Sequence, residues 1–360
     1  MSPDPIVCPF CPLGCDDVRV SHSDGTVDVD CDLARHQFDS AVNHSPARIG
    51  SKTVDTLDFV AFRSRLALPD CPTIEFNGAS IQEAKSIEAL VKTGVIQVNL
   101  DVDAGSVALN QAIARDGVIA ATLGDVCARS DLIWVIGDID SRTPRLAERL
   151  GRSKAKLHQT SVLTVDSLSR LHRASGQRNE ATGRPSDSAG SLIDLIRSSG
   201  YTSIVIGDSP FEKGSEVVAS EMLLRLIARW NELPGSNDRG EDDLLRRAVI
   251  LRIDHHQNLR SVMRWRNNQV SSAGLSVLPS PSVRIGPSCG DQTTNVRLQI
   301  GGPDPGEPSA FAYLPASSPG VHFAEVTIRG DGSISLPLSA IAAAPHASRF
   351  EVLRRMVEIS

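Results

Sequence analysis

Apolar residues in this chain fall into short strand-like runs that are separated by stretches with helical spacing. Residues 131–138, DLIWVIGD, form a continuous apolar run, which is typical of a strand buried on both faces of a parallel sheet. Further strands are predicted at 73–78, 94–100, 155–166, 202–208 and 248–254. These runs alternate with helical segments, and this alternation predicts an α/β fold with mainly parallel sheets.

The helical segments share an apolar face that repeats every three to four residues. In residues 80–93 this face is clearest, and Ser80 is the candidate N-cap because its hydroxyl can accept a first-turn amide hydrogen. Other helices are predicted at 105–117, 142–152, 191–200, 215–233 and 258–268.

The N-terminal residues predict a β-hairpin. Valines alternate with polar residues on both sides of Asp24-Gly25, a dipeptide that favours a tight turn because glycine adopts positive φ easily. A two-residue loop there would place Val20 opposite Val29 and Val18 opposite Cys31. This register would return Cys31 to the neighbourhood of Cys15.

Three units are expected along the chain. The divisions are a four-cysteine hairpin unit at 1–45, a first α/β unit at 46–190, and a second α/β unit with a strand and loop tail at 191–360. The boundary at 190 follows a polar, glycine-rich, arginine-containing stretch at 172–190, interpreted as a linker or as a docking loop for an anion. The tail contains a second hairpin signal at Asp331-Gly332 and is expected to pack against the second α/β unit.

Composition narrows the function classes. The 360 residues have a net charge of -6 and only 4% aromatic residues, which argues against a nucleic-acid-binding protein. No apolar run is long enough to span a membrane, and the N-terminus does not resemble a signal peptide, so a cytoplasmic protein is expected. Of the seven cysteines, Cys71, Cys127 and Cys289 are scattered and are interpreted as small buried residues.

The other four cysteines form the strongest motif. Cys8, Cys11, Cys15 and Cys31 have the spacing C-x2-C-x3-C-x15-C. Thiolates bind zinc and iron–sulfur clusters, and three close cysteines with one remote partner favour a cluster over zinc. The three interpretations of the motif are an iron–sulfur site, a zinc site and a set of thiols that bind no metal.

Two further motifs are weaker. Residues 206–216, IGDSPFEKGSE, could bind an anion at a helix start but match no phosphate-binding fingerprint, so a plain strand-to-helix connection is preferred. Asp254, His255 and His256 follow a strand, where adjacent histidines point in opposite directions and make a poor joint metal site.

The sequence resembles the B subunits of the formylmethanofuran dehydrogenases. The similarity lies in CPFCPLGCDDV at 8–18, followed by Cys31, and in TLGDVCARSDLIWVIGDIDSRTPRLAERL at 122–150. Members of this family belong to the tungsten/molybdenum bis-pterin oxidoreductases, and their N-terminal cysteines hold a 4Fe-4S cluster. The resemblance therefore implies a molybdopterin-oxidoreductase-like fold and a 4Fe-4S cluster at Cys8, Cys11, Cys15 and Cys31.

One position departs from the family. Where the family has the Cys or selenocysteine that binds tungsten or molybdenum, this chain has Asp138, after Gly137. The soft thiolate ligand is replaced by a hard carboxylate. Asp138 is thus the candidate catalytic position, interpreted as inactive, and a tungsten or molybdenum pterin is not expected.

With this departure, the chain resembles the bacterial counterpart of the family, the B subunit of a formyltransferase/hydrolase complex. The resemblance implies a cytoplasmic, non-redox structural subunit that works with A, C and D subunits in methanopterin- and methylofuran-linked one-carbon metabolism. The A and D subunits there perform the hydrolysis and the formyl transfer. The alternative is an active formylmethanofuran dehydrogenase subunit with a 4Fe-4S cluster and a metal pterin.

Overall fold

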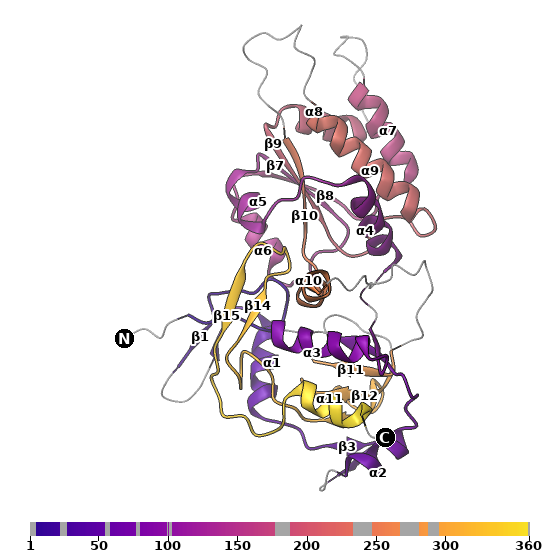
Figure 1. Cartoon of the computed structure of the whole chain (residues 1–360). Coiled ribbons are helices and arrows are strands. Elements are labelled where there is room, and N and C mark those ends of the chain that lie inside the picture. The colour runs from indigo at the N-terminus through magenta and orange to yellow at the C-terminus, as the bar shows by residue number, and fades with distance from the viewer. Residues whose placement is uncertain are drawn as a thin grey trace. The chain divides into compact units, whose positions relative to one another are not determined.

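The structure is a computed structural model, and it divides the chain into two units (Figure 1). Unit 1 contains Met1–Leu100 and Asp254–Ser360, and unit 2 contains Asp101–Ile253. The structure describes residues 5–21, 27–54, 58–76, 80–98, 100, 103–176, 188–232, 247–266, 281–286 and 295–358. Unit 1 is therefore built from both ends of the chain, and unit 2 is inserted between them.

Unit 1 is organised around a seven-stranded sheet with the strand order β4-β3-β13-β12-β11-β5-β6. The five strands from β13 to β6 are parallel, and β3 and β4 extend the sheet in antiparallel fashion. The bounds are β3 Arg48–Ile49, β4 Lys52–Thr53, β5 Thr73–Phe76, β6 Gln97–Val98, β11 Val283–Ile285, β12 Val296–Ile300 and β13 Ala310–Leu314.

The core of unit 1 lies on one face of this sheet. The strand register aligns two apolar rows across four strands, Ile74–Val283–Leu298–Ala312 and Phe76–Ile285–Ile300–Leu314. Four helices supply most of the rest of the same core: α2 Phe59–Leu66, α3 Ile81–Lys92, α10 Gln257–Trp265 and α11 Arg349–Val357. Ser80 caps α3 as predicted, because its side chain accepts the Glu83 amide at 3.0 Å.

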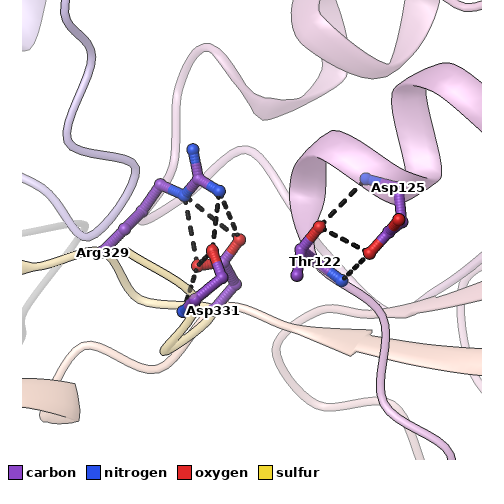
Figure 2. Close-up of polar contacts among 5 residues, drawn as sticks. Thr122, Asp125, Arg329 and Asp331 are labelled. Atoms are coloured by element: carbon purple, nitrogen blue, oxygen red, sulfur yellow. Dashed lines mark hydrogen bonds and ion pairs between the residues drawn. The ribbon is translucent and has the colours of Figure 1, made fainter. Parts of the chain in front are cut away.

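Two hairpins and one helix complete unit 1. They are β1 Arg19–Val20 with β2 Val27–Asp28, β14 Glu325–Ile328 with β15 Ser335–Leu338, and helix α1 Asp32–Val42. The β14–β15 turn is centred on Asp331-Gly332, as predicted, with Gly332 at φ +72°. Figure 2 shows Arg329 bound to Asp331, whose buried carboxylate also accepts the Ser333 amide hydrogen and so stabilises the turn.

Unit 2 is a parallel four-stranded sheet with the order β10-β9-β7-β8. The strands are β7 Leu132–Ile136, β8 Lys156–Thr160, β9 Tyr201–Ile206 and β10 Arg247–Arg252. All five residues of β7 are buried, as the continuous apolar run predicted. The chain leaves β7 towards β8 and leaves β9 towards β10, so the direction of travel reverses between these two central strands.

Helices cover both faces of this sheet (Figure 1). One face packs against α4 Ala104–Asp116, α7 Val165–Gly176, α8 Ser188–Arg197 and α9 Glu216–Asn231. The helices on the other side are α5 Leu123–Arg129 and α6 Leu146–Gly151. In α5 the Thr122 hydroxyl accepts the Asp125 amide and the Asp125 carboxylate accepts the Thr122 amide, a capping box that Figure 2 shows.

The two α/β units do not follow the divisions expected from the sequence. Residue 190 lies inside unit 2, because β7 and β8 before it and β9 and β10 after it belong to one sheet. Residues 46–100 belong to unit 1 rather than to a unit that continues to 190. The C-terminal tail does not join the preceding α/β segment, since β12 and β13 occupy the middle of the sheet that begins in the first 100 residues. Residues 177–187 of the predicted linker lie outside the described residues.

The N-terminal hairpin exists, but its register differs from the predicted one. Val20 pairs with Val27 and Arg19 with Asp28, so the strands are shifted by two residues from the pairing of Val20 with Val29. Asp24-Gly25 lies outside the described residues. Among the helices that the structure describes, none is long and apolar enough to cross a membrane.

Candidate functional site

The first candidate site is the loop that contains three of the four clustered cysteines. Its two arms meet at an isolated antiparallel bridge, in which the Ile6 amide donates to the Val18 carbonyl at 2.8 Å, and the Cys8 amide donates to the Cys15 carbonyl at 2.7 Å. Between them the chain turns back at Gly14, which has φ +52° and donates to the Cys11 carbonyl at 3.2 Å. This geometry sets Cys8 and Cys15 across from each other.

The C-terminal hairpin and its neighbourhood hold this loop in place. The Gly330 amide donates to the Pro12 carbonyl at 2.7 Å. Any Cβ on Gly14 would lie 2.7 Å from the Leu336 side chain, and any Cβ on Gly320 would lie 2.7 Å from Pro9. Both glycines also have positive φ, +52° at Gly14 and +76° at Gly320, so both positions favour glycine. The thiol loop is thus fixed by residues more than 300 positions further along the sequence.

The structure also brings Cys31 near this loop. Cys31 is the N-cap residue of α1 and its side chain makes no capping hydrogen bond. Burial raises the pKa of the Cys8 thiol to about 12, and the neighbouring thiols of Cys15 and Cys31 add to that rise. Cys8 and Cys15 are buried, whereas Cys11 and Cys31 are half-buried, and all four are free thiols.

This arrangement can be tested against the two kinds of metal group that thiolates bind. Among the described residues, which include all four cysteines, no three His, Cys, Asp or Glu side chains lie close enough to hold one metal ion. Around a single zinc, the sulfurs would be about 3.8 Å apart, so no zinc tetrahedron is preformed. A cubane spaces its cysteine ligands more widely than a single zinc ion does, so the iron–sulfur interpretation of the four thiols stays a prediction.

The second candidate site lies at the carboxyl end of the unit 2 sheet, between the neighbouring strands β7 and β9 where the strand order reverses. Open α/β sheets bind ligands at such a reversal point, outside the carboxyl ends of the strands. Here each strand ends in the same three residues, Ile136-Gly137-Asp138 after β7 and Ile206-Gly207-Asp208 after β9.

The two Gly-Asp segments close on each other. Asp138 and Asp208 exchange main-chain hydrogen bonds of 3.0 and 2.7 Å. A Cβ on Gly137 would lie 2.4 Å from the Asp208 carbonyl oxygen, and a Cβ on Gly207 would lie 2.3 Å from that of Asp138. The backbones therefore fill the space at which a ligand would enter between these strands.

The Asp138 carboxylate is engaged by its own loop. It accepts the Asp140 amide at 2.8 Å and the Ser141 amide at 3.4 Å, and the residue is exposed. The Asp208 carboxylate pairs with Arg142 at 3.0 Å and accepts the Ser141 hydroxyl at 3.0 Å. Burial raises the pKa of Asp208, Arg142 and Ser141 oppose that rise, and the charges of Asp103 and Asp138 add to it. The two carboxylates of this site therefore already accept hydrogen bonds from nearby groups of the chain itself.

The repeated Ile-Gly-Asp is a sequence signal of this pairing, although local patterns alone do not connect its two copies. Asp208 falls within the segment 206–216, which the sequence interpretation treats as a plain connection. The rest of that segment connects β9 to α9 as expected, since the Glu216 carboxylate accepts the Gly214 amide at 2.9 Å at the start of α9.

The histidine motif after β10 also has a structural role. Asp254 accepts the His256 amide at 2.9 Å and pairs with Arg260 at 2.7 Å, which positions the start of α10.

The scattered cysteines differ from the sequence interpretation. Cys71 and Cys127 are half-buried rather than buried. The Cys127 thiol lies 3.6 Å from the Arg149 carbonyl oxygen, so it contacts the α6 backbone. Cys289 lies outside the described residues.

Sequence reasoning missed a histidine cluster in unit 1. The His44 ring lies 5.4 Å from that of His322 and 4.8 Å from that of His346, measured between ring centroids. The His322 Nδ1 accepts the Ser318 amide at 3.0 Å, while the His44 Nε2 is buried without a hydrogen-bond partner. No local pattern could have revealed the cluster, because His44 is separated from the other two by hundreds of residues.

Comparison with known proteins identifies a similar fold. No family model and no curated protein sequence matches this chain. Its structure resembles a chain of the formyltransferase/hydrolase complex (FhcABCD) from Methylorubrum extorquens, a crystal structure in complex with methylofuran. The TM-score is 0.56 at 14% sequence identity, and the match covers 87% of this chain and 98% of that chain. The similarity establishes a shared fold over nearly the whole of the known chain.

Proposed function

We propose that this chain is a non-redox structural subunit of a formyltransferase/hydrolase complex, in the place of the B subunit. The observation that supports this most is the end-to-end fold similarity to a chain of such a complex, which covers 98% of that chain. The proposed partners are the A, C and D subunits, and the proposed pathway is methylofuran-linked one-carbon metabolism. Binding of nucleic acid or membranes is not part of this role.

The geometry at Asp138 supports a non-redox role. A tungsten or molybdenum centre needs a free protein ligand and room for its pterin, whereas the Asp138 carboxylate accepts amides of its own loop. The main chains of Asp138 and Asp208 are bound to each other, and neighbouring carboxylates would repel the phosphates of a pterin dinucleotide.

For the four thiols we propose one iron–sulfur cluster, ligated by Cys8, Cys11, Cys15 and Cys31. The group would crosslink the N-terminal loop to the start of α1. Iron and acid-labile sulfide analysis, together with absorbance near 400 nm, tests this assignment. Substitution Cys31→Ser should remove the signal, whereas the control Cys71→Ser should retain it. A colourless protein that contains zinc, or no metal, would contradict the assignment.

The proposed function is tested by co-expression with the subunits encoded beside its gene. The expected result is a stoichiometric complex with formyltransferase and hydrolase activity, a total interface above roughly 2,000 Å², and a melting temperature above that of the isolated chain. Tungsten and molybdenum should be absent. Viologen-linked formyl-methylofuran oxidation with a bound metal pterin would favour an active dehydrogenase subunit instead. A chain that remains monomeric with an unchanged melting temperature would leave the proposal without support.

A further inference from the structure

The two edges of the unit 2 sheet differ in whether their outward main-chain groups are hydrogen-bonded. At one edge, β10 has its outward main-chain groups occupied by the protein itself. The Ile250 amide donates to the Ile119 carbonyl at 2.9 Å, and the Ala121 amide donates to the Ile250 carbonyl at 2.8 Å. The Asn231 side chain binds both the amide and the carbonyl of Ala248, at 2.9 and 2.7 Å. This edge cannot add another strand.

The opposite edge, β8, remains open in the described part of the chain. Its register with β7, together with the bonds Lys156 amide to Asp131 carbonyl and Gly137 amide to Thr160 carbonyl, directs residues 156, 158 and 160 towards β7. Leu157 and Gln159 consequently direct their amides and carbonyls outward. No described residue forms a hydrogen bond with those groups.

The side chains of β8 are also unusually exposed for a parallel strand. Parallel strands are normally buried on both faces, as β7 is. In β8, by contrast, Leu157 is 58% exposed, and Val162, which follows the end of the strand, is 45% exposed. An exposed edge with apolar side chains is a template for pairing with another chain, and proteins usually protect it.

Charge indicates which kind of strand would pair there. Lys154 and Lys156 are exposed, and residues 153–162, which include β8, contain these two lysines and His158 but no Asp or Glu. The nearby carboxylate of Asp131, at the start of β7, is bound to the Tyr201 amide on the β9 side of the sheet at 2.9 Å. Two copies of β8 that paired with each other would bring two basic strands together, and like charges close to each other are unfavourable.

We infer that the β8 edge, at Leu157 and Gln159, binds an extended segment of a partner subunit in which acidic and apolar residues alternate. Main-chain hydrogen bonds would extend the parallel sheet by one strand, with the acidic residues on the Lys154 and Lys156 face and the apolar residues against Leu157. This inference rests on the proposed function, because the partner is another subunit of the proposed complex.

The test uses proline, which removes an amide hydrogen without a change of charge. Gln159→Pro deletes an outward donor and leaves the ladder to β7 intact, whereas His158→Pro removes a donor to β7 and serves as the control for sheet damage. Leu157→Glu tests the apolar contact and is matched by Val218→Glu, at a residue of α9 that is 52% exposed. All variants are co-expressed with the neighbouring subunits, and each isolated chain is melted to verify folding.

The expected result is at least a tenfold loss of co-purified partner for Gln159→Pro and Leu157→Glu, with wild-type melting of the isolated chain and no loss for Val218→Glu. Hydrogen exchange at the Leu157 and Gln159 amides should be at least tenfold slower in the complex than in the isolated chain. Two results together would overturn the inference and leave the proposed function standing: the Gln159→Pro variant assembles as well as the wild type, and the Leu157 and Gln159 amides of the wild-type chain exchange equally fast in the complex and in isolation. A wild-type chain that assembles with no partner would overturn both. A dimer of the chain alone that Gln159→Pro dissociates would show a second copy as the occupant and overturn the stated partner.

Discussion

At the scale of single residues, Gly137 is a position where the backbone permits little change. It has φ +86°, and a Cβ there would lie 2.4 Å from the Asp208 carbonyl oxygen. Gly137→Ala should therefore destabilise the protein by at least about 2 kcal/mol, from backbone strain and the displaced Asp208 segment. Chemical denaturation followed by circular dichroism measures the change.

The control for that substitution is Gly151→Ala. Gly151 ends α6, and a Cβ there would meet no atom within 4 Å. The free energy of unfolding should stay the same or rise slightly, because alanine favours the helix. Equal effects of the two substitutions would show that the close approach of the two Gly-Asp segments contributes no stability.

Another residue-scale feature is the buried ion pair between Arg349 and Glu83. The guanidinium donates to both carboxylate oxygens at 2.9 and 2.6 Å, and both side chains are nearly fully buried. Arg349→Met should cost about 3–5 kcal/mol because it leaves a buried charge without its partner. The double variant Arg349→Met with Glu83→Gln should recover part of that loss, measured by denaturant unfolding. Additive losses would contradict the coupling.

At the scale of elements, the histidine cluster links the end of α1 to the segment that contains His322 and to the loop before α11. Burial, with the charges of His346 and His322 added, lowers the pKa of His44 to about 4. The pKa values of His322 and His346 are also lowered, mainly by burial. The folded protein thus favours neutral rings.

The pH dependence follows from the direction of these shifts. An unfolded histidine takes up a proton near pH 6.5, whereas folded His44 does so only near 4, so stability should be full above about pH 6.5 and decline as the pH falls towards 4. Thermal melts between pH 7.5 and 4 measure this decline. His44→Phe should flatten it while the exposed His36→Phe should not. A wild-type curve that stays level over this range would contradict the assignment of neutral histidines.

The elements also show what local patterns can predict. Most helices and parallel strands, and the Ser80 cap, follow from periodicity because short-range packing determines them. Helices α1, α2, α5, α7 and α11 were not predicted, and α5 was missed although its Thr122–Asp125 capping box is visible in the sequence. The N-terminal register was wrong by two residues, because a turn dipeptide alone does not fix which pairs form. Asp208 and the histidines depend on long-range contacts, which no local pattern reports.

At the scale of the whole molecule, unit 2 is continuous in sequence and has its own core and sheet. A fragment of residues 101–253 is therefore expected to fold alone and to unfold cooperatively. A fragment of residues 1–253 should contain folded unit 2 only, because unit 1 would lack β11, β12 and β13 from the middle of its sheet. Amide exchange measured by NMR or mass spectrometry distinguishes these outcomes. Protected amides in β5 of the 1–253 fragment would contradict them.

The placement of β12 at the centre of the unit 1 sheet also determines when that sheet can form during synthesis. Strands β5 and β6 leave the ribosome long before β11, β12 and β13 exist. At about 5–20 residues per second, the delay is on the order of 10–40 s, ample time for the inserted unit to fold first. During this interval the nascent chain exposes the apolar faces of β5 and α3 and the N-terminal thiols. Chaperone binding to ribosomes that are translating codons 100 to 280 is therefore the step on which the yield of this protein should depend.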